Sequence, residues 1–247
     1  AQGAILRSQI ASTTNDAMKA VYQQRLDFHT QISTILAGRY NAEVQKAIAI
    51  KLIITIKIKI EMIITIIVKY RNAIEEATSE DEANEFRRNV YDLEIRLASL
   101  LKQRVEVEQT MLANIRLSIS FLTQLIVLLR QQSSNSDMAN LWWNSNTILK
   151  QCEDDLALYR QEEENQRTLI EVFQDNYRIQ INLIIQLRIK LGITGRSFIP
   201  IEDVEDEITE EEIEGESDYD LDGETLDFIK VRLDLHIQLL IKIKALL

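Results

Sequence analysis

Apolar residues recur every three or four positions along most of the chain, and this spacing predicts long α-helices. A first helix is expected from about Ala4 to Leu36, ending at Gly38. A second is expected from a cap at Asn41 to about Ala77. No glycine or proline stands between Gly38 and Gly192, so this region has few residues suited to tight turns.

Ser79 and Glu82 have the S-x-x-E spacing of a capping box, which predicts the start of a third helix. Its apolar stripe consists of Leu93, Leu97, Leu100, Val107, Met111, Ile115, Ile119, Leu122, Ile126 and Leu129. The polar stretch 131–137 is expected to be a loop. A fourth helix is expected from about Met138 to Leu191, ended by glycine residues 192 and 195.

The fourth predicted helix has a coiled-coil seam, because its core positions alternate steps of three and four. The seam consists of Leu149, Cys152, Leu156, Tyr159, Glu163, Gln166, Ile170, Phe173 and Tyr177. Glu163 and Gln166 interrupt it with polar groups. These two residues either set the register or oligomeric state, or face solvent.

The segment from Ile48 to Tyr70 carries two periodicities at once. Every even-numbered position is apolar, twelve in succession, which is typical of a β-strand. A heptad seam runs through the same residues: Ile53, Ile56, Ile60, Ile63, Ile67, Tyr70 and Ile74. A strand of this length would be far longer than the usual 3–10 residues, so we expect a helix. The alternative is an edge strand that assembles with other chains.

Together these patterns predict an all-α protein built from long antiparallel helical hairpins or coiled coil. We expect three regions: long helices over 1–192, an acidic, extended linker over 193–224, and a short amphipathic helix or strand over 225–247.

The chain has 247 residues and a formal net charge of −11, but the acidity is confined to one segment. Fifteen Asp and Glu residues and no Lys or Arg lie between positions 202 and 227. Such a block repels nucleic acid and attracts cations or basic partners. With two His and one Cys, the chain has little material for acid–base, nucleophilic or transition-metal catalysis, and we expect no enzyme activity.

The acidic block contains the pattern D-x-D-x-D-G at Asp218, Asp220 and Asp222, the first half of a calcium-binding loop. The bidentate Glu expected at loop position twelve is replaced by Ile229, and Glu224 or Asp227 is a candidate for another ligand. We interpret the three aspartates and Glu224 as a weak Ca²⁺ site. The alternative is a solvated acidic linker.

Three further residues on the fourth helix have alternative interpretations. Cys152 is either a small core residue or a partner in an interchain disulfide. Trp142 and Trp143 are either packing anchors or interface hot spots. The apolar seam assigned to assembly includes Ile60, Ile63, Leu149, Leu156, Ile170 and Phe173.

The chain resembles the ciliate trichocyst matrix proteins, also called granule lattice proteins, over roughly residues 40–180. The residues that carry the resemblance are Trp142, Trp143, Cys152, Glu153, Tyr159, Arg160, Glu163, Glu164, Arg167, Leu169, Val172 and Phe173. The earlier runs 74–76, 81–84 and 87–88 are similar to that family's link into its second long helix.

The resemblance implies an acidic coiled-coil protein of the secretory granule lumen, cut from a precursor and extracellular after discharge. Its partners would be copies of itself or related helical subunits, packed in a lattice or filament that responds to Ca²⁺. The alternative is a helical pore-forming toxin in which residues 48–70 act on a membrane.

Overall fold

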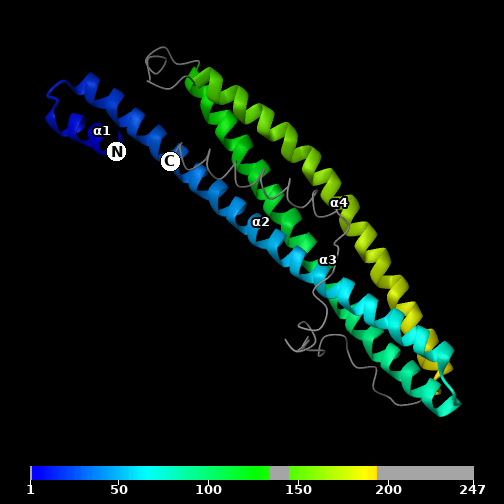
Figure 1. The fold of residues 1–247 in the computed structure, drawn as a ribbon. Coiled ribbons are helices and arrows are strands. Elements are labelled where there is room, and N and C mark those ends of the chain that lie inside the picture. The colour runs from blue at the N-terminus through cyan, green and yellow to red at the C-terminus, as the bar shows by residue number, and fades with distance from the viewer. Residues whose placement is uncertain (1, 134–144, 194–247) are drawn as a thin grey trace. The chain divides into compact units, whose positions relative to one another are not determined.

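The computed structural model describes residues 2–133 and 145–193, and their regular structure is entirely α-helical. The helices are α1 (Gln2–Ser12), α2 (Asp16–Glu76), α3 (Glu80–Ser133) and α4 (Ser145–Lys190), and Figure 1 shows their order. The all-α prediction is confirmed for these ranges, including the choice of helix over strand for residues 48–70.

The chain divides into two compact units, each built from segments of all three long helices. In its described part, the first unit contains residues 2–47, 111–133 and 145–165, and the second contains 48–110 and 166–193. Within the second unit, the Arg104 guanidinium reaches the backbone oxygen of Ile53, while Arg71 contacts Glu94. Both contacts join α2 to α3.

The predicted break at Gly38 is wrong, because α2 continues through both Gly38 and Asn41. The chain breaks earlier, at residues 13–15, where Asn15 Oδ1 accepts hydrogen bonds from the backbone N–H groups of Ala17 (3.0 Å) and Met18 (3.2 Å). Asn15 is thus the N-terminal cap of α2. Gly38 serves packing instead: a Cβ atom there would lie 2.5 Å from Cζ of Phe121.

The predicted start of α3 is confirmed. The backbone N–H of Glu82 donates to Ser79 Oγ at 3.2 Å. The Glu82 carboxylate accepts from the backbone N–H of Thr78 at 3.0 Å, one residue before the partner of a standard capping box. At its other end α3 runs to Ser133, so residues 131–133 of the predicted loop are helical, while 134–137 lie outside the described residues.

The predicted glycine stop of α4 is confirmed at Gly192, which has a φ of 64°. Its N–H donates to the oxygen of Ile189 at 3.1 Å, and the N–H of Ile193 donates to the oxygen of Arg188 at 3.2 Å. These two bonds define a Schellman motif, in which a left-handed glycine satisfies the last carbonyl groups of the helix. The predicted start at Met138 and the second glycine, Gly195, lie outside the described residues.

The heptad seam of residues 48–70 forms the apolar core of the second unit. Ile56, Ile63 and Ile67 are buried against residues 90, 97 and 100 of α3, and Ile60 packs against the same core. Of the nine even positions outside the seam, five are at the surface: Ile48, Leu52, Ile58, Ile64 and Val68 are 41–49% exposed, whereas Ile50 and Met62 are buried. The strand-like alternation therefore reflects aliphatic residues on several faces of one helix.

Replacing Gly38 with Ala is expected to lower the free energy of unfolding by about 1 kcal/mol. Alanine gains about 1 kcal/mol in helix propensity, but moving an aromatic ring out of a packed interface costs about 1–3 kcal/mol. Urea unfolding followed by circular dichroism measures the difference.

Gly3→Ala is the matched control, because its Cβ atom would meet Leu26 Cδ1 at an ordinary 3.8 Å. It should cause no loss of stability. The double variant Gly38→Ala/Phe121→Leu should recover stability relative to Gly38→Ala. A Gly38→Ala protein as stable as the parent would contradict the steric argument.

Candidate functional site

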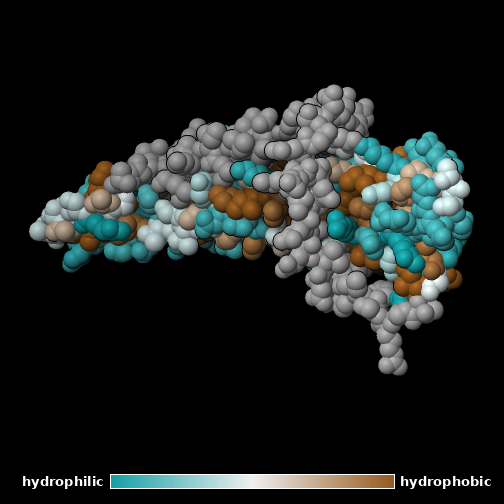
Figure 2. All heavy atoms as spheres, turned by 60° about the horizontal axis from the view of Figure 1, so that its bottom comes forward, coloured by the Kyte–Doolittle hydropathy of each residue, from teal (hydrophilic) through white to brown (hydrophobic). Residues whose placement is uncertain are grey.

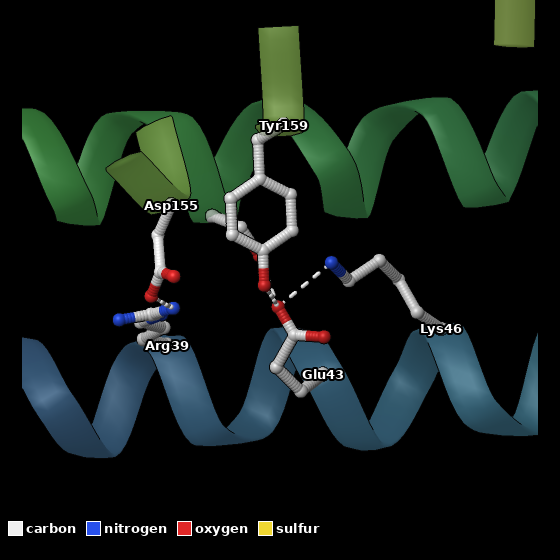
Figure 3. Close-up of polar contacts among 6 residues, drawn as sticks. Arg39, Glu43, Lys46, Asp155 and Tyr159 are labelled. Carbon is white, nitrogen blue, oxygen red and sulfur yellow. Dashed lines mark hydrogen bonds and ion pairs between the residues drawn. The ribbon is translucent and has the colours of Figure 1, made fainter. Parts of the chain in front are cut away.

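The first unit contains a buried polar cluster between α2, α3 and α4, centred on Glu43 (Figure 3). Lys46 Nζ lies 2.7 Å from Glu43 Oε1, and both side chains are 0% exposed. The Tyr159 hydroxyl on α4 donates to the same carboxylate, and Ser118 Oγ on α3 donates to it at 3.1 Å. One carboxylate thus joins three helix segments.

The aromatic ring of Tyr159 completes the surroundings of the two cations in this cluster. Lys46 Nζ lies 4.0 Å from the ring centroid, and the Arg39 guanidinium lies 5.8 Å from it. Arg39 Nη2 also pairs with Asp155 Oδ2 at 2.6 Å. Ion pairing and cation–π attraction together offset the cost of removing these cations from water.

Burial governs the protonation of the cluster. It lowers the pKa of Lys46, although the Glu43 carboxylate works in the opposite direction. Burial, followed by the charge of Glu43, raises the pKa of Tyr159, so its hydroxyl keeps the proton that it donates. Burial also raises the pKa of Cys152 to about 11, with smaller contributions from charges that include Asp155.

These groups face one another and not solvent. Arg39, Glu43, Lys46 and Tyr159 are all at most 3% exposed. A substrate in solution therefore has no direct access to them in this arrangement. The cluster fixes the axial register of three helix segments relative to one another.

The second unit contains two carboxylates held in the same way, one by Gln166 and the other by Gln180. Gln166 Nε2 donates to the backbone oxygen of Glu108 at 3.0 Å and also to its carboxylate. Gln180 Nε2 donates to the backbone oxygen of Glu94 at 3.1 Å and also to its carboxylate. We call each of these pairs a Glu–Gln clamp.

An arginine completes each clamp from the other carboxylate oxygen. Arg104 Nη2 lies 2.6 Å from Glu108 Oε1, and Arg71 Nη2 lies 2.8 Å from Glu94 Oε1. The two carboxylates are 0% and 2% exposed, so they depend on these partners for their hydrogen bonds.

The two clamps repeat with the period of the helices. Glu94 and Glu108 are 14 residues apart on α3, and Gln166 and Gln180 are 14 residues apart on α4. Fourteen residues are two heptads, so both clamps lie on one seam. A slip of one heptad would remove the glutamine from both glutamates at once, which makes this register specific.

The prediction that Glu163 and Gln166 either set the register or face solvent has a different answer for each residue. Gln166 is 1% exposed and forms a clamp. Glu163 has a side chain that is 20% exposed and pairs with Arg116 at 2.9 Å near the surface of the first unit. Gln166 is therefore placed to fix the register.

The structure separates the residues predicted to form an interface. Ile63 and Ile170 are buried at 2% and 8% exposure within the second unit. Ile60 and Phe173 are partly buried and line one groove in that unit. Leu149 and Leu156 are partly buried in the first unit. Trp142 and Trp143 lie outside the described residues.

Of the remaining predicted site residues, Cys152 is among the described residues and the four calcium candidates are not. Cys152 is a free, buried thiol at 3% exposure. The predicted calcium ligands Asp218, Asp220, Asp222 and Glu224 lie outside the described residues. Within 2–133 and 145–193, no group of three or more His, Cys, Asp or Glu side chains is arranged to hold a metal ion.

A groove of about 560 Å³ in the second unit is lined by residues of α2, α3 and α4. Most of its lining is aliphatic or aromatic: Ile50, Ile53, Ile60, Ile64, Leu97, Leu101, Leu169, Phe173 and Ile179. Lys57 and Glu61, which lie 3.5 Å apart, add a charged pair to its wall. Arg104 lies over the Phe173 ring at 4.6 Å.

Sequence reasoning missed the buried cluster of Glu43, although a signal was present. Arg39 and Lys46 precede the buried Ile53 by fourteen and seven residues, and Glu43 precedes Ile50 by seven. Arg39 and Lys46 therefore continue the heptad seam of α2, and Glu43 continues the adjacent row of Ile50. Extending the seam toward the N-terminus would have placed the two cations in the core.

Comparison with protein-family models, curated proteins and solved structures found no match for this chain.

Replacing Gln166 with Leu is expected to lower the free energy of unfolding by about 2–3 kcal/mol, because it removes two hydrogen bonds to Glu108, one of them to a buried charge. Gln161→Leu is the control, since Gln161 is exposed on the same helix and donates a hydrogen bond to exposed Asn165 at 3.1 Å. Its effect should stay within about 0.5 kcal/mol. Equal, small effects in urea unfolding would show that the clamp contributes little.

The stability contributed by Cys152 is expected to fall with rising pH. Its folded pKa of about 11 lies above the ordinary thiol value of 9.0, so the folded chain holds this proton more tightly than the unfolded chain. The contribution is therefore complete below about pH 9 and lost between about pH 9 and pH 11. Two pKa units correspond to at most about 2–3 kcal/mol.

The measurement is the free energy of unfolding of the parent and of Cys152→Ala from about pH 8 to pH 11. Comparing the two proteins cancels the titration of Lys46 and Tyr159. The curves should converge as the pH rises. Parallel curves would contradict a buried, protonated thiol.

Proposed function

We propose that this chain is a structural, self- or co-assembling subunit of a secretory-granule (extrusome) lattice or filament, with cation-responsive packing. The observation that carries the proposal is the set of large aliphatic side chains left at the surface of the second unit. Val68 on α2 is 49% exposed, and Ile189 on α4 is 74% exposed. Exposed apolar patches are typical of sites that a partner covers.

The exposed aliphatic residues are numerous on both helices. On α2 they are Ile48, Leu52, Ile58, Ile64 and Val68, and on α4 of this unit they are Val172, Ile179, Ile185 and Ile189. Figure 2 shows apolar patches interrupting the hydrophilic surface on the face that it presents. Since the seams are already filled by the chain itself, these outer residues are the ones available to neighbouring chains.

The buried polar contacts support the antiparallel hairpin or coiled-coil arrangement that such an assembly would use. Glu43 meets Ser118 in the first unit, and Glu94 and Glu108 meet glutamines in the second. Helices held in one register present the same outer residues in every copy. Repeated assembly depends on such identical surfaces.

The cation response is assigned to the acidic segment with Asp218, Asp220, Asp222 and Glu224. Fifteen acidic residues in one stretch repel one another, and bound Ca²⁺ would relieve that repulsion. The resemblance to trichocyst matrix proteins supports this mechanism and a location in the granule lumen, with release to the exterior. Catalysis has no part in the proposal.

The double variant Val68→Lys/Ile189→Lys is expected to abolish assembly while leaving helix content unchanged. Sedimentation velocity and negative-stain imaging, each with and without Ca²⁺, measure the assemblies. Asn72→Lys/Gln186→Lys is the matched control, because it adds the same charge at exposed polar positions of the same helices. A parent chain that stays monomeric under every condition would overturn the proposal, as would assembly that the aliphatic variant leaves intact.

A helical pore-forming toxin remains the second candidate, favoured by one observation on α3. The helix Glu80–Gln132 is long and apolar enough to cross a membrane by length and composition, with 39% of its most apolar window buried. Residues 48–70, the segment first assigned to the membrane, instead carry five charged residues: Lys51, Lys57, Lys59, Glu61 and Lys69. Dye release from liposomes by the monomer, unaffected by Val68→Lys/Ile189→Lys, would favour this candidate.

A further inference from the structure

The apolar groove of the second unit, which α2, α3 and α4 line, has the side chains expected of a site for one more helix. The wall formed by α2 repeats at heptad spacing, with Ile50, Lys57 and Ile64 in one row and Ile53 and Ile60 in the next. A wall of two adjacent heptad rows is the surface onto which the seam of another helix packs.

The other two helices contribute rows of the same kind. Leu97 and Arg104 on α3 are seven residues apart, as are Phe173 and Gln180 on α4. The groove is therefore bounded on three sides by helices whose rows share one period. A helix with a heptad seam fits such a groove better than an extended segment does, because a strand repeats every second residue.

The end of the chain carries such a seam. Leucine occupies one heptad position four times, at Leu226, Leu233, Leu240 and Leu247. The paired position holds Ile229, His236 and Ile243. This is the pattern of leucine at one core position and β-branched residues at the other, with a single polar interruption.

The same segment also alternates like a strand, since its odd positions from Ile229 to Ile243 are all apolar. Residues 48–70 show both patterns too, and there the heptad seam is the one that is buried, in a helix. The physical situation is the same in both segments, because each offers a continuous apolar seam to helices with matching rows. The helix is therefore the expected form where such a partner surface exists.

We propose that residues 225–247 form a further helix, which packs in the groove lined by α2, α3 and α4 of the same chain. The occupant's seam of leucine and isoleucine covers Ile60 and Phe173, which are only partly buried. This inference goes beyond the proposed assembly and does not depend on it, because it concerns an intramolecular contact. Ile64 and Ile179 belong to both surfaces, but Val68 and Ile189, on which assembly is tested, do not line the groove.

Length and reach agree with this proposal. The groove extends over Ile50–Ile64 on α2, about 21 Å of helix, and 23 helical residues span about 34 Å. From Gln180 to the end of the described chain at Ile193 is about 20 Å. The 31 residues 194–224 can extend to about 100 Å, so the segment can return to the groove.

Covalent connection favours the chain's own segment over a second copy. A linker of this length holds the segment near the groove at an effective concentration well above that of free protein in dilute solution. A second copy would have to compete against this intramolecular contact. Occupancy should therefore be independent of protein concentration.

Hydrogen–deuterium exchange of the full chain tests the proposal at low protein concentration and without Ca²⁺. The amides of residues 226–247 should be protected in the parent. Ile64→Lys places a charge at the rim of the groove, where Ile64 is 45% exposed, so the helices should still fold. Exchange within residues 226–247 should then be about tenfold faster.

The reciprocal variant changes the other partner. Leu233→Asp/Leu240→Asp should speed exchange both in its own segment and in residues 50–64 of α2. Gln238→Asp/Lys242→Asp is the control off the leucine positions, and it should leave the groove residues as they are in the parent.

Three results would overturn the proposal. One is exchange of residues 226–247 at the rate of an unstructured peptide in the parent chain. Another is protection that Ile64→Lys does not change. The last is protection that disappears on dilution, which would identify a second copy as the occupant. None of these results bears on Val68 or Ile189, so the assembly proposal fails or stands separately.

Discussion

The structure depends on buried carboxylates that find their partners in only one alignment of the helices. Seams of isoleucine and leucine resemble one another from heptad to heptad, so they stabilise several alignments almost equally. A buried glutamate does not tolerate such a change, because leaving it without partners costs several kcal/mol. The buried carboxylates of Glu43, Glu94 and Glu108 therefore select one register from the several that the apolar seams would allow.

The buried aliphatic positions provide stability, and the buried polar positions provide specificity of packing. The core around Ile63 and Leu100 supplies the hydrophobic stabilisation of the second unit. The clamps at Glu94 and Glu108 add specificity, at a cost in desolvation that the arginine and glutamine partners offset. In the first unit, Lys46 and Tyr159 perform the same task around Glu43 with ion pairing and cation–π contact.

The elements that sequence reasoning predicted correctly are those determined by nearby residues. Ser79 caps a helix through Glu82, three residues away, and Gly192 closes α4 on carbonyl groups within four residues of it. The mistaken stop at Gly38 has a distant cause, because the residue that requires a glycine there, Phe121, is on another helix. Local rules cannot identify a glycine selected by such a contact.

The candidate site was harder to predict for the same reason. Glu43 meets Tyr159 across 116 residues and Ser118 across 75. A charge in a heptad seam is visible in the sequence, but its partner is not, so the choice between a solvated face and a buried pair stays open. Gln166 is visible in the sequence because it stands within the predicted seam of the fourth helix, whereas Glu108, between Val107 and Gln109, lies outside the predicted apolar stripe of the third helix and interrupts nothing.

The two kinds of apolar surface in the second unit differ in what they can accept. Exposed ridges such as Val68 and Ile189 contact a partner on one side only, so many such contacts must add up before an interface is stable. The groove is lined by residues of three helices, so a helix entering it would bury more apolar area for each of its residues. A single amphipathic helix can therefore satisfy the groove, while the ridges require a repeated array of neighbours. This difference in geometry is why the concave surface is assigned to the chain's own seam of leucines and the convex one to assembly.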